Sequence, residues 1–311
     1  MTISEYTQAI RARTLPLLCL TFLLAWCNNV AAESKNLRIS ADIAPIHSLV
    51  SLVIGDQSTV NLIVPPDLSP HDFALKPSQL RTLNQAQLIV IVSEDFSPSL
   101  SRHLKTLSPD NLILDLSKTL AENESHDNDI HKDRTHKEDT HLHDDEHSWL
   151  NPQNAITWLD HIAQVVATID EPNRNKYELN ATAAIASLTQ LYQELTEQLA
   201  SVRTAPYIVH HDAYQHFAHA FGLAKPQAIA LSDARAPSAA KLKQIRKAGE
   251  NSHCIFSEVQ HDDAIIDTVS AGLGMKRGIL DPLGSDIPIG PNLYETLMQT
   301  LANRFSECLA D

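Results

Sequence analysis

Histidine is the residue with metal chemistry that stands out in this chain, which holds 16 of them among 311 residues. Six lie between residues 121 and 147 among aspartates and glutamates: His126, His131, His136, His141, His143 and His147. Imidazole suits Zn, Cu and Ni, and neighbouring carboxylates concentrate cations. Because the segment lacks hydrophobic periodicity, we predict a disordered surface loop that binds metal weakly, since binding must order the chain. A solvated polar loop that binds no metal is the alternative.

Four side chains are candidates for a preformed metal site: His71, His147, His211 and Asp281. His71, His211 and Asp281 each follow or end a predicted strand, and His147 ends the acidic loop where ordered sequence resumes. Proteins with α/β sheets bind ligands at the carboxyl ends of their parallel strands. Two candidates come from each half of the chain, so a single ion bound by all four would lie between two lobes.

The elements that must position these residues are short β-branched runs that alternate with helical stretches. Runs that are apolar on both faces suit parallel strands covered by helices on both sides. We predict eight strands, at residues 37–43, 60–64, 88–92, 112–116, 207–209, 227–230, 254–256 and 278–280. The fold class is therefore α/β, with two (βα)₄ lobes built on parallel sheets.

Between these two sets of strands lies the clearest helical pattern, from near Glu171 to Val202. Asp170 can cap this helix, Pro172 lies in its first turn, and apolar residues recur at steps of three and four. At 1.5 Å per residue the helix would span roughly 45 Å, as a rigid spine that disfavours wide hinge closure. We therefore divide the exported chain into an N-terminal lobe (33–170, including the acidic loop 121–147), a linker helix (171–203) and a C-terminal lobe (204–311).

The first 32 residues have the pattern of a secretory signal peptide. Arg11 and Arg13 precede an apolar run from Leu15 to Trp26, and Val30-Ala31-Ala32 is an acceptable cleavage site. A lipidated Cys27 is the alternative, although the bulky Trp26 before it disfavours that reading. We expect export, and the rest of the chain has no run long and apolar enough to cross a membrane.

Charge and cysteine content restrict the remaining possibilities. The formal net charge of −14 disfavours nucleic acid and anionic membrane surfaces as partners, because both are polyanions. After removal of the signal peptide, Cys254 and Cys308 are the two cysteines left. An even number in an oxidising compartment favours one disulfide, which would tie the last helix to the sheet. Two separate buried thiols are the alternative.

The four candidate ligands lie in motifs that together resemble a known family. In chain order these are Ser69-Pro70-His71-Asp72-Phe73, His147-Ser148-Trp149-Leu150-Asn151-Pro152, His211-Asp212-Ala213-Tyr214 and Asp281-Pro282-Leu283-Gly284. The chain resembles the periplasmic zinc-binding component of bacterial ABC uptake transporters, the ZnuA type of solute-binding protein, over essentially its whole mature length. The resemblance implies two lobes joined by a backbone helix, zinc at their interface, and delivery to an inner-membrane permease driven by a cytoplasmic ATPase.

Carried over residue by residue, the resemblance implies that His71, His147 and His211 are the first three ligands and Asp281 the carboxylate. Three neutral imidazoles and one carboxylate satisfy four-coordinate Zn²⁺. Relatives that transport manganese or iron carry glutamate at the third position, so His211 favours zinc. Some zinc-binding members have an acidic residue where this chain has Pro70, so water or Asp281 alone must complete the coordination. Binding should weaken below about pH 6.5, because protonated imidazole cannot ligate.

Other functions remain open at this point. A manganese or iron carrier of the same family is the nearest alternative. A zinc hydrolase also uses three histidines with an open fourth position, but the chain has no His-Glu-x-x-His motif and Asp281 is placed to fill that position. A periplasmic zinc buffer without a transporter partner is the third. We expect a monomeric carrier that is not an enzyme and whose mature chain does not insert into membranes.

Three neighbours of the candidate ligands have less certain roles. His210 should point away from His211 if strand alternation persists, and is not expected to ligate. Glu258 faces either the metal crevice, as a partner of a ligand, or the core. Asp212 is a candidate for orienting a ligand imidazole through its second nitrogen.

Overall fold

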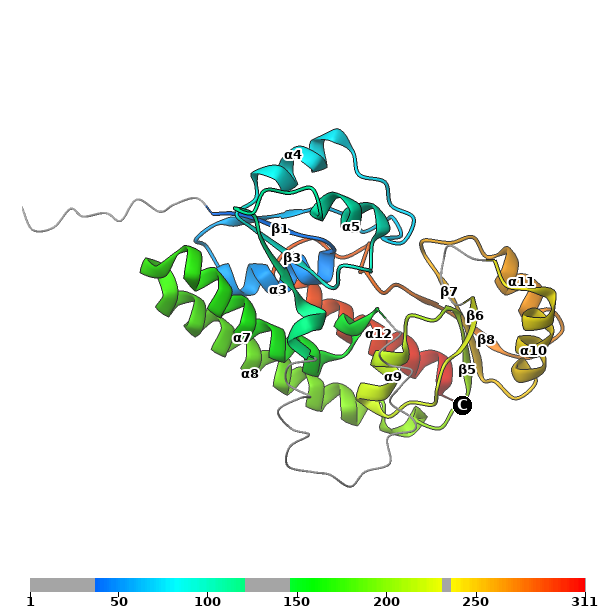
Figure 1. Cartoon of the computed structure of the whole chain (residues 1–311). Helices are drawn as coiled ribbons and strands as arrows, with labels where there is room; N and C mark the ends of the chain where they lie inside the picture. Colours follow the sequence, from blue (N-terminus) through cyan, green and yellow to red (C-terminus); the bar gives the residue numbers. More distant parts are fainter. Residues whose placement is uncertain (1–36, 121–145, 231–235, 311) are drawn as a thin grey trace, which may run out of the picture. The chain divides into compact units, whose positions relative to one another are not determined.

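The computed structural model describes residues 37–120, 146–230 and 236–310 (Figure 1). The predicted signal peptide and all but the last two residues of the predicted histidine-rich loop lie outside the described residues. Glu146 and His147 lie within them. Within these three ranges, no helix is both long enough and apolar enough to cross a membrane.

The first sheet holds four parallel strands in the order β2-β1-β3-β4. One of its two central strands, β3 (Leu88–Ile91), is buried at every position, as expected for a strand covered on both faces. The other strands are β1 (Arg38–Ala41), β2 (Thr59–Leu62) and β4 (Leu112–Asp115), and the connecting helices are α3 (Ala44–Ile54), α4 (Pro77–Gln85) and α5 (Pro98–Leu104). The four strands predicted in this part of the chain are confirmed.

The second sheet repeats this topology, with four parallel strands in the order β6-β5-β7-β8. The strands are β5 (Tyr207–His211), β6 (Gln227–Ala230), β7 (Cys254–Glu258) and β8 (Lys276–Leu280), and the helices are α9 (Gln215–Phe221), α10 (Ala239–Gly249) and α11 (Ala264–Ser270). The predicted fold class, α/β with two four-stranded parallel sheets, is therefore confirmed. In both sheets the carboxyl ends of the central strands lie at one edge, where ligands of α/β proteins bind.

Two long helices connect the sheets in sequence. The helix α7 (Pro152–Ile169) follows the short 3-10 helix η2 (Ser148–Leu150). Its N-cap residue is Asn151, whose side chain accepts a hydrogen bond from the Gln153 amide at 3.0 Å. The helix α8 (Arg174–Gln198) follows, between the 3-10 helices η3 (Glu171–Asn173) and η4 (Ala200–Val202). The long helix predicted from Glu171 to Val202 is confirmed, with its first and last turns wound as 3-10 helix.

The two sheets share a hydrophobic core. Its larger cluster contains Ile39 of β1, Leu188 of α8, Val209 of β5 and Phe305 of α12 (Leu293–Leu309). A smaller cluster lies between the second sheet and helices α10 and α11, with the residues Ile208, Ile229, Ile245, Ile255, Ile266 and Val269. A continuous close-packed core resists deformation, so the shared cluster opposes large relative movement of the sheets.

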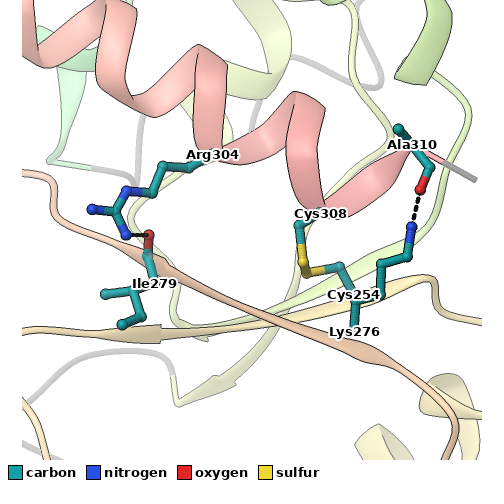
Figure 2. Close-up of a disulfide and its surroundings, with 6 residues drawn as sticks. All are labelled: Cys254, Lys276, Ile279, Arg304, Cys308 and Ala310. Carbon is teal, nitrogen blue, oxygen red and sulfur yellow. Dashed lines mark hydrogen bonds between the residues drawn. A yellow bond between two sulfur atoms is a disulfide. The ribbon is translucent and has the colours of Figure 1, made fainter.

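The C-terminal helix α12 contacts elements at both ends of the chain. Near its start, the Ser48 hydroxyl of α3 donates to the Pro291 carbonyl at 2.8 Å and accepts from the Tyr294 amide at 3.0 Å. Near its end, Cys308 forms a disulfide with Cys254 of β7, and their Cα atoms lie 5.8 Å apart (Figure 2). The pairing favoured by the sequence is confirmed.

The surroundings of the disulfide let α12 approach the second sheet closely. A Cβ atom on Gly278 of β8 would lie 2.6 Å from the Phe256 ring and 3.2 Å from Sγ of Cys308, so glycine is required there. Alongside, Arg304 donates to the Ile279 carbonyl at 3.2 Å, and Lys276 donates to the Ala310 carbonyl (Figure 2). The disulfide holds the helix against β7, and these two hydrogen bonds hold it against the edge strand β8.

Replacing both cysteines, as Cys254→Ala/Cys308→Ala, is expected to lower the free energy of unfolding by about 3–4 kcal/mol. The reason is that the bridge joins residues 54 apart and so restricts the unfolded chain. Denaturant titration of metal-free protein would measure the loss. Adding a reductant should bring the wild type down to the stability of the variant and leave the variant unchanged. Equal stabilities of the oxidised wild type and the variant would contradict the prediction.

Candidate metal centre

Three of the four predicted ligands converge at one point. One ligand atom each of His71, His147 and His211 lies within 4.8 Å of the other two. The Nε2 atom of His147 lies 3.3 Å from Nε2 of His71 and 3.3 Å from Nε2 of His211. His147 and His211 are buried, with 7% and 3% of their surface exposed, and His71 is half-buried. The three imidazoles therefore present nitrogen atoms to a shared, largely dehydrated space.

The loop that carries His71 is restricted by proline. Residues 63–76, between β2 and α4, include Pro65, Pro66 and Pro70, each of which fixes its own φ angle. The Leu68 amide donates to the Pro65 carbonyl at 3.1 Å and closes a turn just before His71. Such a loop loses little further conformational freedom when its histidine binds an ion.

The His147 backbone is held by the start of α7. The His147 carbonyl accepts a hydrogen bond from the Leu150 amide at 3.1 Å. Asn154, in the first turn of α7, donates its side-chain amide to the Ser148 carbonyl at 2.9 Å. The backbone of the segment after the acidic loop is thus fixed by local hydrogen bonds.

Trp149 links this segment to the second half of the chain. Its fully buried indole Nε1 donates to the Pro282 carbonyl at 2.8 Å, and its own carbonyl accepts from the Tyr294 hydroxyl at 2.7 Å. Burial raises the pKa of Tyr294 above its ordinary value, so the phenol stays a neutral donor. The Trp149 ring lies 5.1 Å from that of His147, centroid to centroid. These contacts hold His147 in place relative to the elements that carry His211.

His211 is the last residue of β5, and it contacts a buried carboxylate on the neighbouring strand β7. Its Nδ1 atom lies 2.8 Å from each oxygen of Glu258, which is 3% exposed. A carboxylate that accepts a hydrogen bond from the Nδ1–H group of an imidazole fixes the tautomer and leaves Nε2 as the atom that can bind a metal. Nε2 is also the atom that faces His147. Of the two readings of Glu258 in the sequence, the geometry favours the partner of a ligand.

Apolar side chains form part of the walls of the site. Besides the histidines and the polar residues Ser69, Glu258 and Gln260, its cavity is lined by Pro70, Phe96, Trp149, Pro282 and Leu283. The Phe96 ring lies 5.0 Å from that of His71, edge to face. An apolar surround limits the access of water to a metal centre and so strengthens its electrostatic interactions.

An acidic residue also lies beside His71, although not at position 70, where some zinc-binding relatives have one. Pro70 precedes His71, but an oxygen of Glu146 lies 3.9 Å from Nδ1 of His71, and the Glu146 side chain is 35% exposed. At that distance and exposure the interaction is weak. Glu146 contributes negative charge next to the site.

The structure does not bring Asp281 into the group of three histidines. Its carboxylate accepts hydrogen bonds from the Leu283 amide at 3.0 Å and from the amide and hydroxyl of Ser285 at 2.5 and 2.7 Å. The Gln260 side chain donates to it as well, at 2.9 Å. In this arrangement Asp281 closes the turn after β8, next to the cavity wall formed by Pro282 and Leu283.

The remaining neighbours of the candidate ligands make different contacts. Asp212 accepts a hydrogen bond from Gln215 at 2.7 Å, while Glu258 contacts the His211 imidazole. His210 belongs to neither group of metal-ligating atoms among the described residues. Its ring stacks on His261, which lines the cavity and which the sequence did not single out. His261 follows β7, so the strand-end rule that selected the other histidines would have included it.

Comparison with known proteins gives relatives along nearly the whole chain. The high-affinity zinc uptake system protein ZnuA of Brucella suis biovar 1 is 33% identical over 323 residues, covering 93% of this chain and 96% of the relative. The protein of the same name from Paracoccus denitrificans is 33% identical over 304 residues, with 89% and 93% covered.

Solved structures agree with these relatives. A zinc-bound ZnuA with residues 138–173 deleted has a TM-score of 0.72 and 26% identity, over 89% of this chain and 99% of that one. The laminin-binding protein Lbp of Streptococcus pyogenes shares the fold, with a TM-score of 0.71, 22% identity and coverage of 87% and 98%. A family model described as zinc-uptake complex component A, periplasmic, matches residues 39–308. The chain therefore belongs to the ZnuA family of periplasmic zinc-uptake components.

Proposed function

We propose that this protein captures Zn²⁺ in the periplasm and delivers it to an inner-membrane ABC permease. In this proposal Zn²⁺ is cargo, His71, His147 and His211 bind it through Nε2, and the protein performs no chemistry on it. Family membership and relatives named for high-affinity zinc uptake support the assignment. The predicted signal sequence at residues 1–32 supports export.

The observation that carries the proposal is the spacing of the imidazole nitrogens. For tetrahedral Zn²⁺ with Zn–N bonds of about 2.0–2.1 Å, two ligand nitrogens lie about 3.3 Å apart. The Nε2 atoms of His71 and His211 each lie 3.3 Å from Nε2 of His147. The spacing of these two pairs therefore matches the spacing that a tetrahedral zinc site requires.

The fourth coordination position is assigned to Asp281 or to water. Ligation by Asp281 would require its carboxylate to leave hydrogen bonds with Leu283 and Ser285. Water requires no such exchange. In either case the negative charge of the buried Glu258 carboxylate, which contacts His211, offsets part of the positive charge of the zinc ion.

The fold suits a carrier that moves little between its zinc-free and zinc-bound states. We assign residues 33–170 and 204–311 to two lobes, joined by the helical linker 171–203. The hydrophobic cluster that spans both sheets, and the bonds from Trp149 to Pro282 and from Tyr294 to Trp149, oppose wide opening. A change confined to loops around the cavity would then signal zinc loading to the permease.

Zinc titration of the wild type and of a variant lacking residues 122–145 tests the proposal. Calorimetry of the variant should retain one tight site, because the three imidazoles lie outside the deleted segment. The weaker binding of the acidic loop should disappear, since those histidines are removed. The deletion also distinguishes a carrier from a zinc buffer, because a buffer would bind zinc through the deleted loop and would lose its binding.

Loss of all tight binding on deletion would refute the assignment to His71, His147 and His211. A matched control shortens the same segment but keeps its histidines, for example by removing residues 127–130. This control should keep both the tight site and part of the weak binding, which shows that shortening the loop does not itself disturb the site.

A further inference from the structure

A second set of potential ligands adjoins the first and shares one residue with it. One ligand atom each of His211, Glu258 and His261 lies within 4.8 Å of the other two. His211 and Glu258 are buried, and His261 is half-buried in the loop after β7. We propose that these three residues form a second position for a borderline divalent cation such as Zn²⁺, from which the ion passes to or from the three-histidine site.

The chemistry of this second position suits the same class of ion. Two imidazoles and one carboxylate are ligands that Zn²⁺ accepts, as in catalytic sites with two histidines and one glutamate. Glu258 is 3% exposed, and a buried carboxylate is stable only when a cation or hydrogen-bond donors compensate its charge. A bound divalent cation would provide that compensation directly.

The second position opens into the same cavity as the first. The cavity lining includes His261 and Glu258 together with His71, His147 and His211. The His261 ring is stacked on that of His210, with centroids 4.3 Å apart and planes within 6° of parallel. This stacking fixes the plane of the ring, and the centroid of His211 lies 6.1 Å away. An ion could thus move between the two positions without returning to bulk solvent.

His211 makes the two positions alternatives rather than partners. A neutral imidazole has one nitrogen with a free lone pair, because the other carries the proton. With zinc on Nε2, the proton resides on Nδ1, which faces Glu258. For His211 to ligate through Nδ1 instead, that proton must leave Nδ1 and Nε2 must be protonated. The geometry therefore predicts a single ion held by His211 at a time.

The second position also differs from the first in where its ligands come from. His211, Glu258 and His261 all follow α8 in the chain, whereas the first position needs His71 and His147 from before it. The second can therefore hold an ion while the contacts of His71 and His147 are not made, as during loading or release. The inference extends the proposed function, because the ion exchanged is the zinc of the first site.

The test removes the first position and asks what remains in the full-length chain. In His71→Ala/His147→Ala, zinc should still bind, more weakly than in the wild type, and crystals should show an anomalous zinc peak among His211, Glu258 and His261. Adding His261→Phe should lower the residual affinity at least about tenfold in a chelator competition. Phenylalanine keeps a ring that can stack on His210 but offers no ligand atom. His219→Phe, at an exposed position on α9, is the matched control and should change nothing.

Two results would overturn the second position: no anomalous peak at these residues in the double variant, or residual affinity that His261→Phe leaves unchanged. The anomalous zinc peak of the wild type distinguishes failure of the second position from failure of the proposed function. A wild-type zinc peak at His71, His147 and His211 upholds the carrier site whatever the double variant shows. A wild-type peak elsewhere would overturn both.

Discussion

Replacing His211 by alanine is expected to lower zinc affinity at least about 100-fold. Removal of a residue that merely orients a ligand costs about 10–100-fold, so loss of a ligand should reach at least the upper end of that range. His211 has two further connections that the change would break, since its Nε2 faces His147 and its Nδ1 contacts Glu258. Zinc competition against a chromogenic chelator measures the affinity, and uptake of zinc by cells that depend on this protein measures delivery.

The matched control for this prediction is His219→Ala. His219 is exposed on α9, close in sequence to His211, and belongs to neither group of metal-ligating atoms among the described residues. The His219→Ala replacement should leave zinc affinity and zinc uptake unchanged. Stability must be compared without zinc, because a ligand that binds the folded state raises its apparent stability. Wild-type affinity in a folded His211→Ala protein would exclude His211 as a ligand.

Much of the fold could be predicted from the sequence because its elements have local signals. The strand β3 is apolar at every position, and the long helix shows apolar residues at steps of three and four after Pro172. The order of strands within each sheet has no such signal, since it depends on which distant strands pair. The packing of α3 on α12 is equally non-local, because it joins Ser48 to Tyr294, which lie 246 residues apart in the sequence.

The candidate site also has parts that the sequence predicts and parts that it does not. His71 and His211 were selected because they follow or end predicted strands, and the structure brings them together with His147. Asp281 satisfies the same rule, yet its carboxylate accepts hydrogen bonds from Leu283 and Ser285. An aspartate before a Pro-Leu-Gly turn can cap the turn or ligate a metal, and sequence does not separate these roles. Its role as a ligand stays a prediction.

The partners of His211 show a further limit of sequence analysis. Glu258 reaches His211 because β5 and β7 are neighbours in the sheet, a pairing between residues 47 apart. His261 reaches them through the conformation of the loop after β7, for which the sequence has no periodicity. Contacts across strands and loops of this kind decide which nitrogen of an imidazole is available to a metal, so they bear directly on function.

Replacing Trp149 by alanine is expected to reduce both stability and zinc affinity. Truncating a fully buried tryptophan costs about 3–5 kcal/mol, through lost burial and the cavity that remains. The indole also donates to the Pro282 carbonyl, which would lose its partner. Because the ring lies 5.1 Å from that of His147, its loss frees the His147 imidazole to move, and zinc affinity should fall about tenfold. Denaturant titration of the metal-free chain and chelator competition measure the two effects.

Trp158→Ala separates the two effects, because Trp158 matches Trp149 in all but location. It is also fully buried, and its indole donates to the Leu116 carbonyl at 3.0 Å, but it does not line the cavity. The two variants should therefore lose similar stability, while zinc affinity falls in Trp149→Ala alone. An equal loss of affinity in both would mean that general destabilisation weakens the site. An unchanged affinity in Trp149→Ala would mean that the hydrogen bonds of the His147 backbone, without the indole, suffice to position the imidazole.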